Sequence, residues 1–147
     1  MTGRLRQAVT GEDGAVTTEV ALYVPITVVV ACLLWAFGAT YTADSAVLHA
    51  TINAARQASL ARTAAQAQRD ATAVARQILD EHNLRCRTMT VTVDTAGFGV
   101  PVGQPAQVAV DVDCQISLAD LAVPGLSGQK TLHEHQVSPL DTSRARQ

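Results

Sequence analysis

The fold is decided by an apolar stretch that one glutamate introduces, EVALYVPITVVVACLLWAFGATY, residues 19–41. From Val20 to Tyr41 this stretch holds no Asp, Glu, Lys or Arg. About 20 apolar residues, each rising ~1.5 Å along a helix, cover the ~30 Å hydrocarbon core of a bilayer. The stretch therefore predicts a transmembrane helix over about residues 20–41. A cleaved secretory signal has a shorter apolar core that ends at a small-x-small site, so we expect this anchor to stay in the mature protein.

Glu19 lies immediately before the predicted span, and two interpretations of this residue are open. An ionised carboxylate at membrane depth is costly unless it meets a cation, which makes Glu19 a candidate functional residue. The alternative is a solvated carboxylate at the level of the lipid headgroups, where it complements the positive end of the helix dipole.

Basic residues near the span predict its orientation in the membrane. Arg4 and Arg6 precede the span, and the next basic residue in the chain is Arg56. Because cytoplasmic flanks carry the excess of Lys and Arg, we expect the N-terminus inside the cell and the rest of the chain outside.

The composition excludes several classes of function. The formal net charge is −2, aromatic residues make up 3% of the chain, and no basic stripe is interleaved with them, so nucleic-acid binding is not expected. No Gly-x-Ser-x-Gly turn, glycine-rich phosphate loop or Cys-x-x-Cys pair occurs, so we expect neither an enzyme nor a bound cofactor. His133 and His135 share one face of an expected strand, with Glu134 on the other. Two histidines without a third ligand predict a polar surface rather than a metal site.

The chain is expected to form an α+β fold, a long N-terminal helix followed by a small antiparallel β-rich head. Residues 1–14 indicate a polar cytoplasmic leader that ends in a glycine hinge. Residues 15–81 contain no proline except Pro25 and no glycine except Gly38, and they predict one long helix. Pro25 removes one backbone hydrogen bond and is expected to kink that helix inside the membrane. Residues 82–137 predict the head.

A row of mostly small residues runs along the water-exposed half of that helix at steps of three and four residues, interrupted by Gln57 and Gln68. Its members are Val47, Ala50, Ala54, Ala61, Ala64, Ala71, Ala75 and Ile78. This spacing is typical of a helix face that packs closely on a partner. The partner is either the chain's own head or another subunit, and the sequence leaves both open.

Strands are expected in the head. Residues 87–94 and 107–114 alternate between β-branched and polar side chains, and a turn rich in Gly and Pro, residues 96–105, separates them. Residues 117–128 predict a short helical turn and loop, followed by a third strand at 130–137. The tail, residues 138–147, is expected to be flexible.

The cysteines divide between the span and the head. Cys32 lies in the span, where it behaves as a small apolar residue. Cys86 and Cys114 flank the predicted hairpin, so an antiparallel register could bring them together, and the outer compartment is oxidising. A disulfide between them is the favoured prediction, and two free buried thiols are the alternative.

These pieces together resemble the TadE-like pseudopilins of the tight-adherence (Flp) pilus, in the type IV pilin superfamily. The segment Gly14-Ala-Val-Thr-Thr-Glu19 is similar to the prepilin peptidase site of that family, in which cleavage follows the glycine and leaves a glutamate at the fifth mature position. The next residues, Glu19 to Pro25, resemble the family's apolar stretch with a proline six residues after the glutamate. The chain is much longer than the short major Flp pilins, so it resembles a minor pilin or pseudopilin.

The resemblance implies cleavage between Gly14 and Ala15 by a prepilin peptidase. It also implies a homo- or hetero-oligomer with other pilins or pseudopilins, and contact with the pilus assembly platform in a bacterial cytoplasmic membrane. After cleavage, the new α-ammonium of Ala15 lies at the depth of Glu19, so the Glu19 of one subunit can pair with the amine of a neighbour. The competing hypothesis is an unprocessed single-pass anchor whose outer domain binds another cell-envelope protein.

Overall fold

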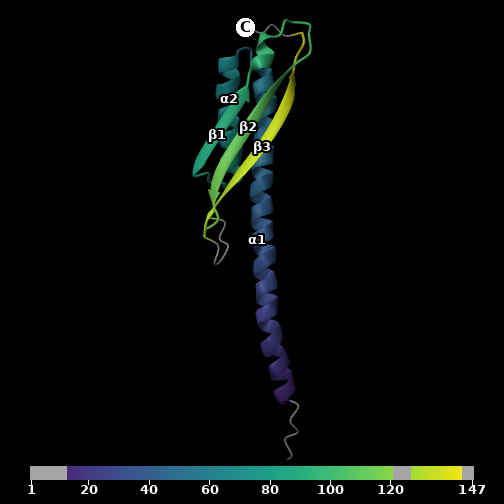
Figure 1. The fold of residues 1–147 in the computed structure, drawn as a ribbon, viewed down its shortest axis with the longest axis vertical. Helices are drawn as coiled ribbons and strands as arrows, with labels where there is room; N and C mark the ends of the chain where they lie inside the picture. Colours follow the sequence, from purple (N-terminus) through teal and green to yellow (C-terminus); the bar gives the residue numbers. More distant parts are fainter. Residues whose placement is uncertain (1–12, 121–126, 144–147) are drawn as a thin grey trace, which may run out of the picture. The chain divides into compact units, whose positions relative to one another are not determined.

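The computed structural model describes residues 13–120 and 127–143, with side chains from Val20 onward. Its elements are, in chain order, α1 (Asp13–Leu60), α2 (Ala64–Glu81), β1 (Thr88–Asp94), the 3-10 helix η1 (Ala96–Gly99), β2 (Ala106–Ser117) and β3 (Gln129–Leu140). Figure 1 shows this order as a long first helix and then a small sheet, which is the predicted α+β class. The chain divides into two compact units, Met1–Trp35 and Ala36–Gln147, and α1 contributes residues to both.

The second unit is built around an antiparallel sheet with the strand order β1-β2-β3. The side chains of β2 alternate strictly, because successive residues of a strand point to opposite faces. The inward set is fully or almost fully buried and comprises Val108, Val110, Val112, Cys114 and Ile116. Figure 1 shows both helices on one side of the sheet, and the inward set of β2 shares a single core with them.

The helices contribute small side chains to that core. In α2 every fourth residue is buried, namely Ala67, Ala71, Ala75 and Leu79. The buried residues of α1 are Ala43, Ala46, Val47, Ala50, Thr51, Ala54, Ala55 and Ala58. Thr51 donates its hydroxyl proton to the carbonyl oxygen of Val47 at 2.8 Å, so it adds no unpaired polar group to the interior. Short side chains let helix backbones approach closely, which is how a chain with few aromatic residues fills its core.

Polar contacts connect the helices to the two outer strands. Lys130 of β3 forms an ion pair with Asp44 of α1 at 3.0 Å. The side-chain amide of Gln68 in α2 donates to the carbonyl of Val91 at 2.8 Å and accepts from the backbone N–H of Val93 at 3.2 Å. Gln68 therefore provides partners for one carbonyl and one N–H of β1.

The prediction of one helix over residues 15–81 is wrong at Ala61–Thr63, where the structure has a break between α1 and α2. Thr63 has extended backbone angles (φ −132°, ψ 151°), and its hydroxyl accepts from the backbone N–H of Gln66 at 3.1 Å. The side chain of Gln66 accepts in turn from the backbone N–H of Arg62 at 3.4 Å. These bonds satisfy one free donor of the first turn of α2 and one N–H just before it, which partly compensates for the backbone bonds that the break removes.

The burial of the row of small residues shows what the row contacts. Val47, Ala50, Ala54, Ala61, Ala71 and Ala75 are buried within this chain, and Ala64 and Ile78 are half-buried. The structure thus supports packing of the row in the chain's own core. The compact second unit begins at Ala36, so it contains α2 and the part of α1 from Ala36 to Leu60 as well as the sheet.

The end of α2 matches the prediction at residue 81 and has a clear local cause. Asn83 has a positive φ of 54°, a conformation that few non-glycine residues adopt. The N–H of Leu84 bonds the carbonyl of Leu79 at 2.9 Å, and the N–H of Asn83 bonds that of Asp80 at 3.0 Å. This is a Schellman motif, in which two of the last carbonyls of the helix gain partners and the chain leaves toward β1.

The three predicted strands are confirmed, with β2 and β3 longer than expected. The flexible tail is wrong for Ser138–Leu140, which complete β3. Leu140 pairs with Ala106 in the register and is buried, so packing in the core fixes the end of β3. Residues 144–147 of the predicted tail, and residues 121–126 of the predicted turn and loop, lie outside the described part.

Replacing Gly97 by alanine is expected to destabilise the second unit. A Cβ at Gly97 would collide with the backbone carbonyl of Gln107 in β2 and press on Leu140, and backbone cannot yield as a flexible side chain can. We expect a loss of about 1 to 3 kcal/mol in the free energy of unfolding, measured by urea denaturation. Gly99→Ala is the matched control, because a Cβ there meets nothing within 4 Å. Equal stabilities of the two variants would contradict this account.

Candidate functional site

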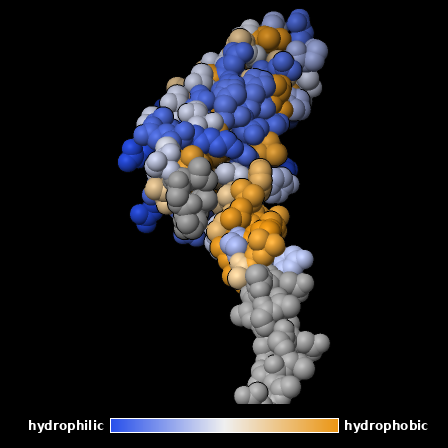
Figure 2. All heavy atoms as spheres, turned by 60° about the horizontal axis from the view of Figure 1, so that its bottom comes forward, coloured by the Kyte–Doolittle hydropathy of each residue, from blue (hydrophilic) through white to orange (hydrophobic). Residues whose placement is uncertain are grey.

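The first half of α1 carries a long exposed apolar surface. Every residue of the helix from Val20 to Trp35 is exposed. The exposed large side chains continue through Phe37 to Tyr41, which is 76% exposed. Figure 2 shows hydrophobic residues gathered over this helix and hydrophilic residues over much of the sheet-bearing part. By length and composition α1 is apolar enough to cross a membrane, because a window of 18 residues within Val20–Leu60 has a mean hydropathy of 2.4.

The threonines of this segment place no free hydroxyl on that surface. Thr27 donates to the carbonyls of Tyr23 and Val24 at 3.0 and 2.9 Å. Thr40 and Thr42 make the same bonds one turn back, to the carbonyls of Ala36 and Gly38 at 3.1 and 3.0 Å. A hydroxyl proton that stays within its own helix needs no water, which suits a hydrocarbon environment.

Pro25 lies inside α1, and the helix continues through it. Proline has no N–H, so the carbonyl of Ala21 loses its helical donor there. The kink stays a prediction.

The predicted peptidase site falls at the beginning of α1. The helix starts at Asp13, so the bond between Gly14 and Ala15 lies in its first turn, and Glu19 follows on the same helix. First-turn N–H groups have no partner within the helix, so this turn is held by fewer bonds than the helix interior. The side chains of Gly14, Ala15 and Glu19 lie outside the described part of the chain.

The predicted disulfide between Cys86 and Cys114 is present, with a Cα–Cα distance of 5.3 Å. The residue opposite Cys114 in the register is Met89, and Cys86 lies just before β1, so the bridge ties the approach to β1 to the middle of the sheet. Cys114 is fully buried. Cys32, the free cysteine of the described residues, is exposed on the apolar part of α1.

A group of histidines and aspartates lies on the face of the sheet opposite the helices, and the sequence analysis identified only half of it. The register sets Asp113 opposite His133 and Asp111 opposite His135. In each pair, the ring atom Nδ1 of the histidine lies 2.7 Å from Oδ1 of the aspartate. We call these four residues the His–Asp ladder. The sequence shows only the spacings, Asp111-x-Asp113 and His133-x-His135, and the pairing of the two motifs follows from the register.

The ladder changes the titration of one histidine. The hydrogen bond to Asp113 and the charge of that carboxylate raise the pKa of His133 above its ordinary value of 6.5. The charged form of His133 is therefore favoured by the fold. The contribution of charged His133 to the stability of the fold is therefore fully present below pH 6.5 and is lost as the pH rises through the raised pKa.

Asp113→Asn is expected to lower the pKa of His133, because it removes the charge and weakens the main hydrogen bond. The measurement is an NMR titration of the ring protons in buffer free of metal ions. The wild-type chain should titrate above 6.5, and the variant lower. A wild-type midpoint at or below 6.5 would contradict the ladder geometry.

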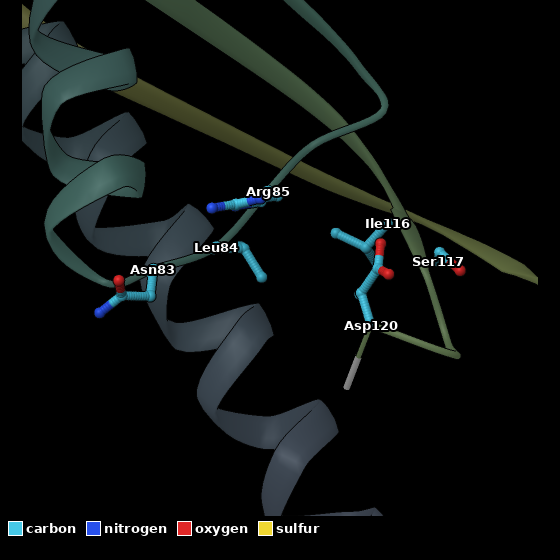
Figure 3. A pocket seen from close by; sticks show the side chains of 6 residues that line it. All are labelled: Asn83, Leu84, Arg85, Ile116, Ser117 and Asp120. Atoms are coloured by element: carbon cyan, nitrogen blue, oxygen red, sulfur yellow. The ribbon is translucent and has the colours of Figure 1, made fainter. Parts of the chain in front are cut away.

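A cavity of about 290 Å³ lies between the end of α2 and the end of β2. Its lining residues are Asn83, Leu84, Arg85, Ile116, Ser117 and Asp120. Figure 3 shows the side chain of Arg85 pointing away from Asp120, so the two charged groups do not converge on a common point. Within residues 20–120 and 127–143, moreover, no group of three or more His, Cys, Asp or Glu side chains is placed to hold a metal ion.

Comparison with known proteins found no similar protein. No protein-family model, curated protein or solved structure matches the chain.

Proposed function

We propose that this chain is a structural membrane pseudopilin or minor pilin, cleaved by a prepilin peptidase and contributing to a Tad-type pilus or a related secretion filament. The observation that carries the proposal is the uninterrupted exposed apolar surface of α1, directly preceded in the sequence by Gly14 and Glu19. Such a helix needs either lipid or other helices around it, and a pilin uses both in turn.

The orientation of the proposed anchor agrees with the chemistry of the second unit. An N-terminus inside the cell leaves the sheet outside, where disulfides persist, and this unit carries the bridge between Cys86 and Cys114. Cytoplasmic proteins rarely keep such a bridge. The positions of Arg4 and Arg6 before the span support the same orientation.

The ends of the apolar segment also support an anchor. Tyr23 lies near its beginning, and Trp35 and Tyr41 lie toward its end, all of them exposed. Tyr and Trp are enriched at the two membrane–water interfaces, because each ring has an apolar body and a polar tip.

Gly14→Leu is expected to block processing, because the peptidase cleaves after a small residue, and to leave a full-length species in the membrane. The measurement is the size of the membrane-bound chain when it is produced together with a prepilin peptidase. Gly11→Leu is the matched control, since it introduces the same side chain within the leader and away from the bond. If the Gly14→Leu chain were shortened like the wild type, cleavage would not occur after Gly14. If neither chain were shortened, an unprocessed anchor would replace the pseudopilin.

A further inference from the structure

The outer face of the sheet carries two histidines whose side chains are fixed by the strand opposite. His133 and His135 are two residues apart on β3, so their rings rise from the same face. Their side chains are 58% and 52% exposed. In the described residues the helices cover the other face, so the rings of the His–Asp ladder are open to solvent (Figure 1).

The aspartates select one form of each neutral ring. A carboxylate can only accept, so in each pair Nδ1 carries the proton that Asp113 or Asp111 binds at 2.7 Å. The other ring nitrogen, Nε2, then holds a lone pair. A carboxylate on one nitrogen and a cation on the other is the arrangement that metal-binding histidines use, because the carboxylate fixes the ring and makes Nε2 more basic.

We propose that His133 and His135 bind one divalent transition-metal ion of the zinc type through their Nε2 atoms, with water completing the coordination. Imidazole nitrogen suits Zn²⁺, Ni²⁺ and Cu²⁺ and not Mg²⁺ or Ca²⁺, which prefer oxygen. The Nε2 atom of His133 lies 4.0 Å from Oδ1 of Asp111, so a bound cation sits beside a carboxylate that offsets its charge. Two protein ligands make a weaker site than the usual three or four of a resident metal.

The test is a Zn²⁺ titration of the full chain in detergent micelles, with no polyhistidine tag and after removal of metal ions by a chelator. The wild type should bind one Zn²⁺ per chain, with shifts in the ring-proton NMR signals of His133 and His135. Loss of a carboxylate that hydrogen-bonds a ligating histidine lowers metal affinity about 10- to 100-fold. The Zn²⁺ affinity of the Asp113→Asn variant should therefore be lower than that of the wild type by a factor in this range. His133→Gln and His135→Gln should each cost at least as much.

The chain provides a matched control in its two remaining histidines. His49 and His82 are stacked with a distance of 6.4 Å between ring centroids, and they lie on α1 and just after α2 rather than on the sheet. The double variant His49→Gln/His82→Gln should bind Zn²⁺ as the wild type does. Absence of saturable binding, binding unchanged in the two β3 variants, or binding lost in the control would each overturn the proposal. It does not depend on cleavage at Gly14, so its outcome is separate from that of the proposed function.

Discussion

Replacing Glu19 by glutamine is expected to abolish pilus assembly while leaving the chain inserted in the membrane and cleaved after Gly14. Glutamine keeps the size and polarity of the side chain and removes its charge. A neutral amide enters a bilayer more easily than an ionised acid, so insertion should not suffer. What the variant loses is the partner for the α-ammonium of Ala15 on a neighbouring subunit. An amine left unpaired in hydrocarbon is strongly unfavourable, which should prevent subunits from joining in register.

The readout for Glu19→Gln is the number of filaments on the cell surface together with crosslinking between subunits. Glu12→Gln is the matched control, because it removes a carboxylate from the leader that cleavage discards. Normal filaments from the Glu19→Gln strain would rule out charge pairing and indicate that Glu19 is an interfacial carboxylate. The pilin-like layout would still stand.

The second large effect is expected from Cys86→Ser, which should strongly destabilise the second unit. The bridge spans a sequence separation of 28 residues, and restricting an unfolded loop of that length contributes roughly 3 to 4 kcal/mol in the chain-entropy model. For a unit of this size, the loss corresponds to a fall in melting temperature of about 10 to 20 °C. The core is made largely of alanine and valine side chains, so little apolar area remains to compensate.

The measurement is thermal unfolding of the full chain followed by circular dichroism. Cys86 is half-buried, so the serine itself adds little penalty there, and any large effect belongs to the bridge. Cys32→Ser is the control, because Cys32 is free and exposed on α1. A melting temperature of Cys86→Ser within 2 °C or so of the wild type would mean that the bridge contributes no stability, contrary to the usual shift of about 4 °C or more per kcal/mol in a unit this small.

The parts of the fold that follow local patterns could be predicted from the sequence. Alternation of β-branched and polar residues marked β1 and β2, and the placement of Cys86 and Cys114 around them indicated the bridge. The apolar surface of α1 could also be predicted from a local pattern, since an uncharged apolar stretch of that length is typical of a helix that spans a membrane. In each case the signal lies within one continuous segment.

The features that the sequence analysis missed depend on segments meeting in space. The break at Ala61–Thr63 contains no glycine or proline, and its local signal is the capping pattern from Thr63 to Gln66. That pattern is decisive only because α2 buries its alanines in the core shared with the sheet. Likewise, Asp111 and Asp113 become partners of His133 and His135 only once the register of β2 and β3 is known.

The most direct test of the central claim is the N-terminus of the native protein, isolated from membranes and measured by intact mass and N-terminal sequencing. The account predicts a chain that begins at Ala15 and lacks residues 1–14. A native chain that begins at Met1 or Thr2, or one cut near residue 39, would contradict it.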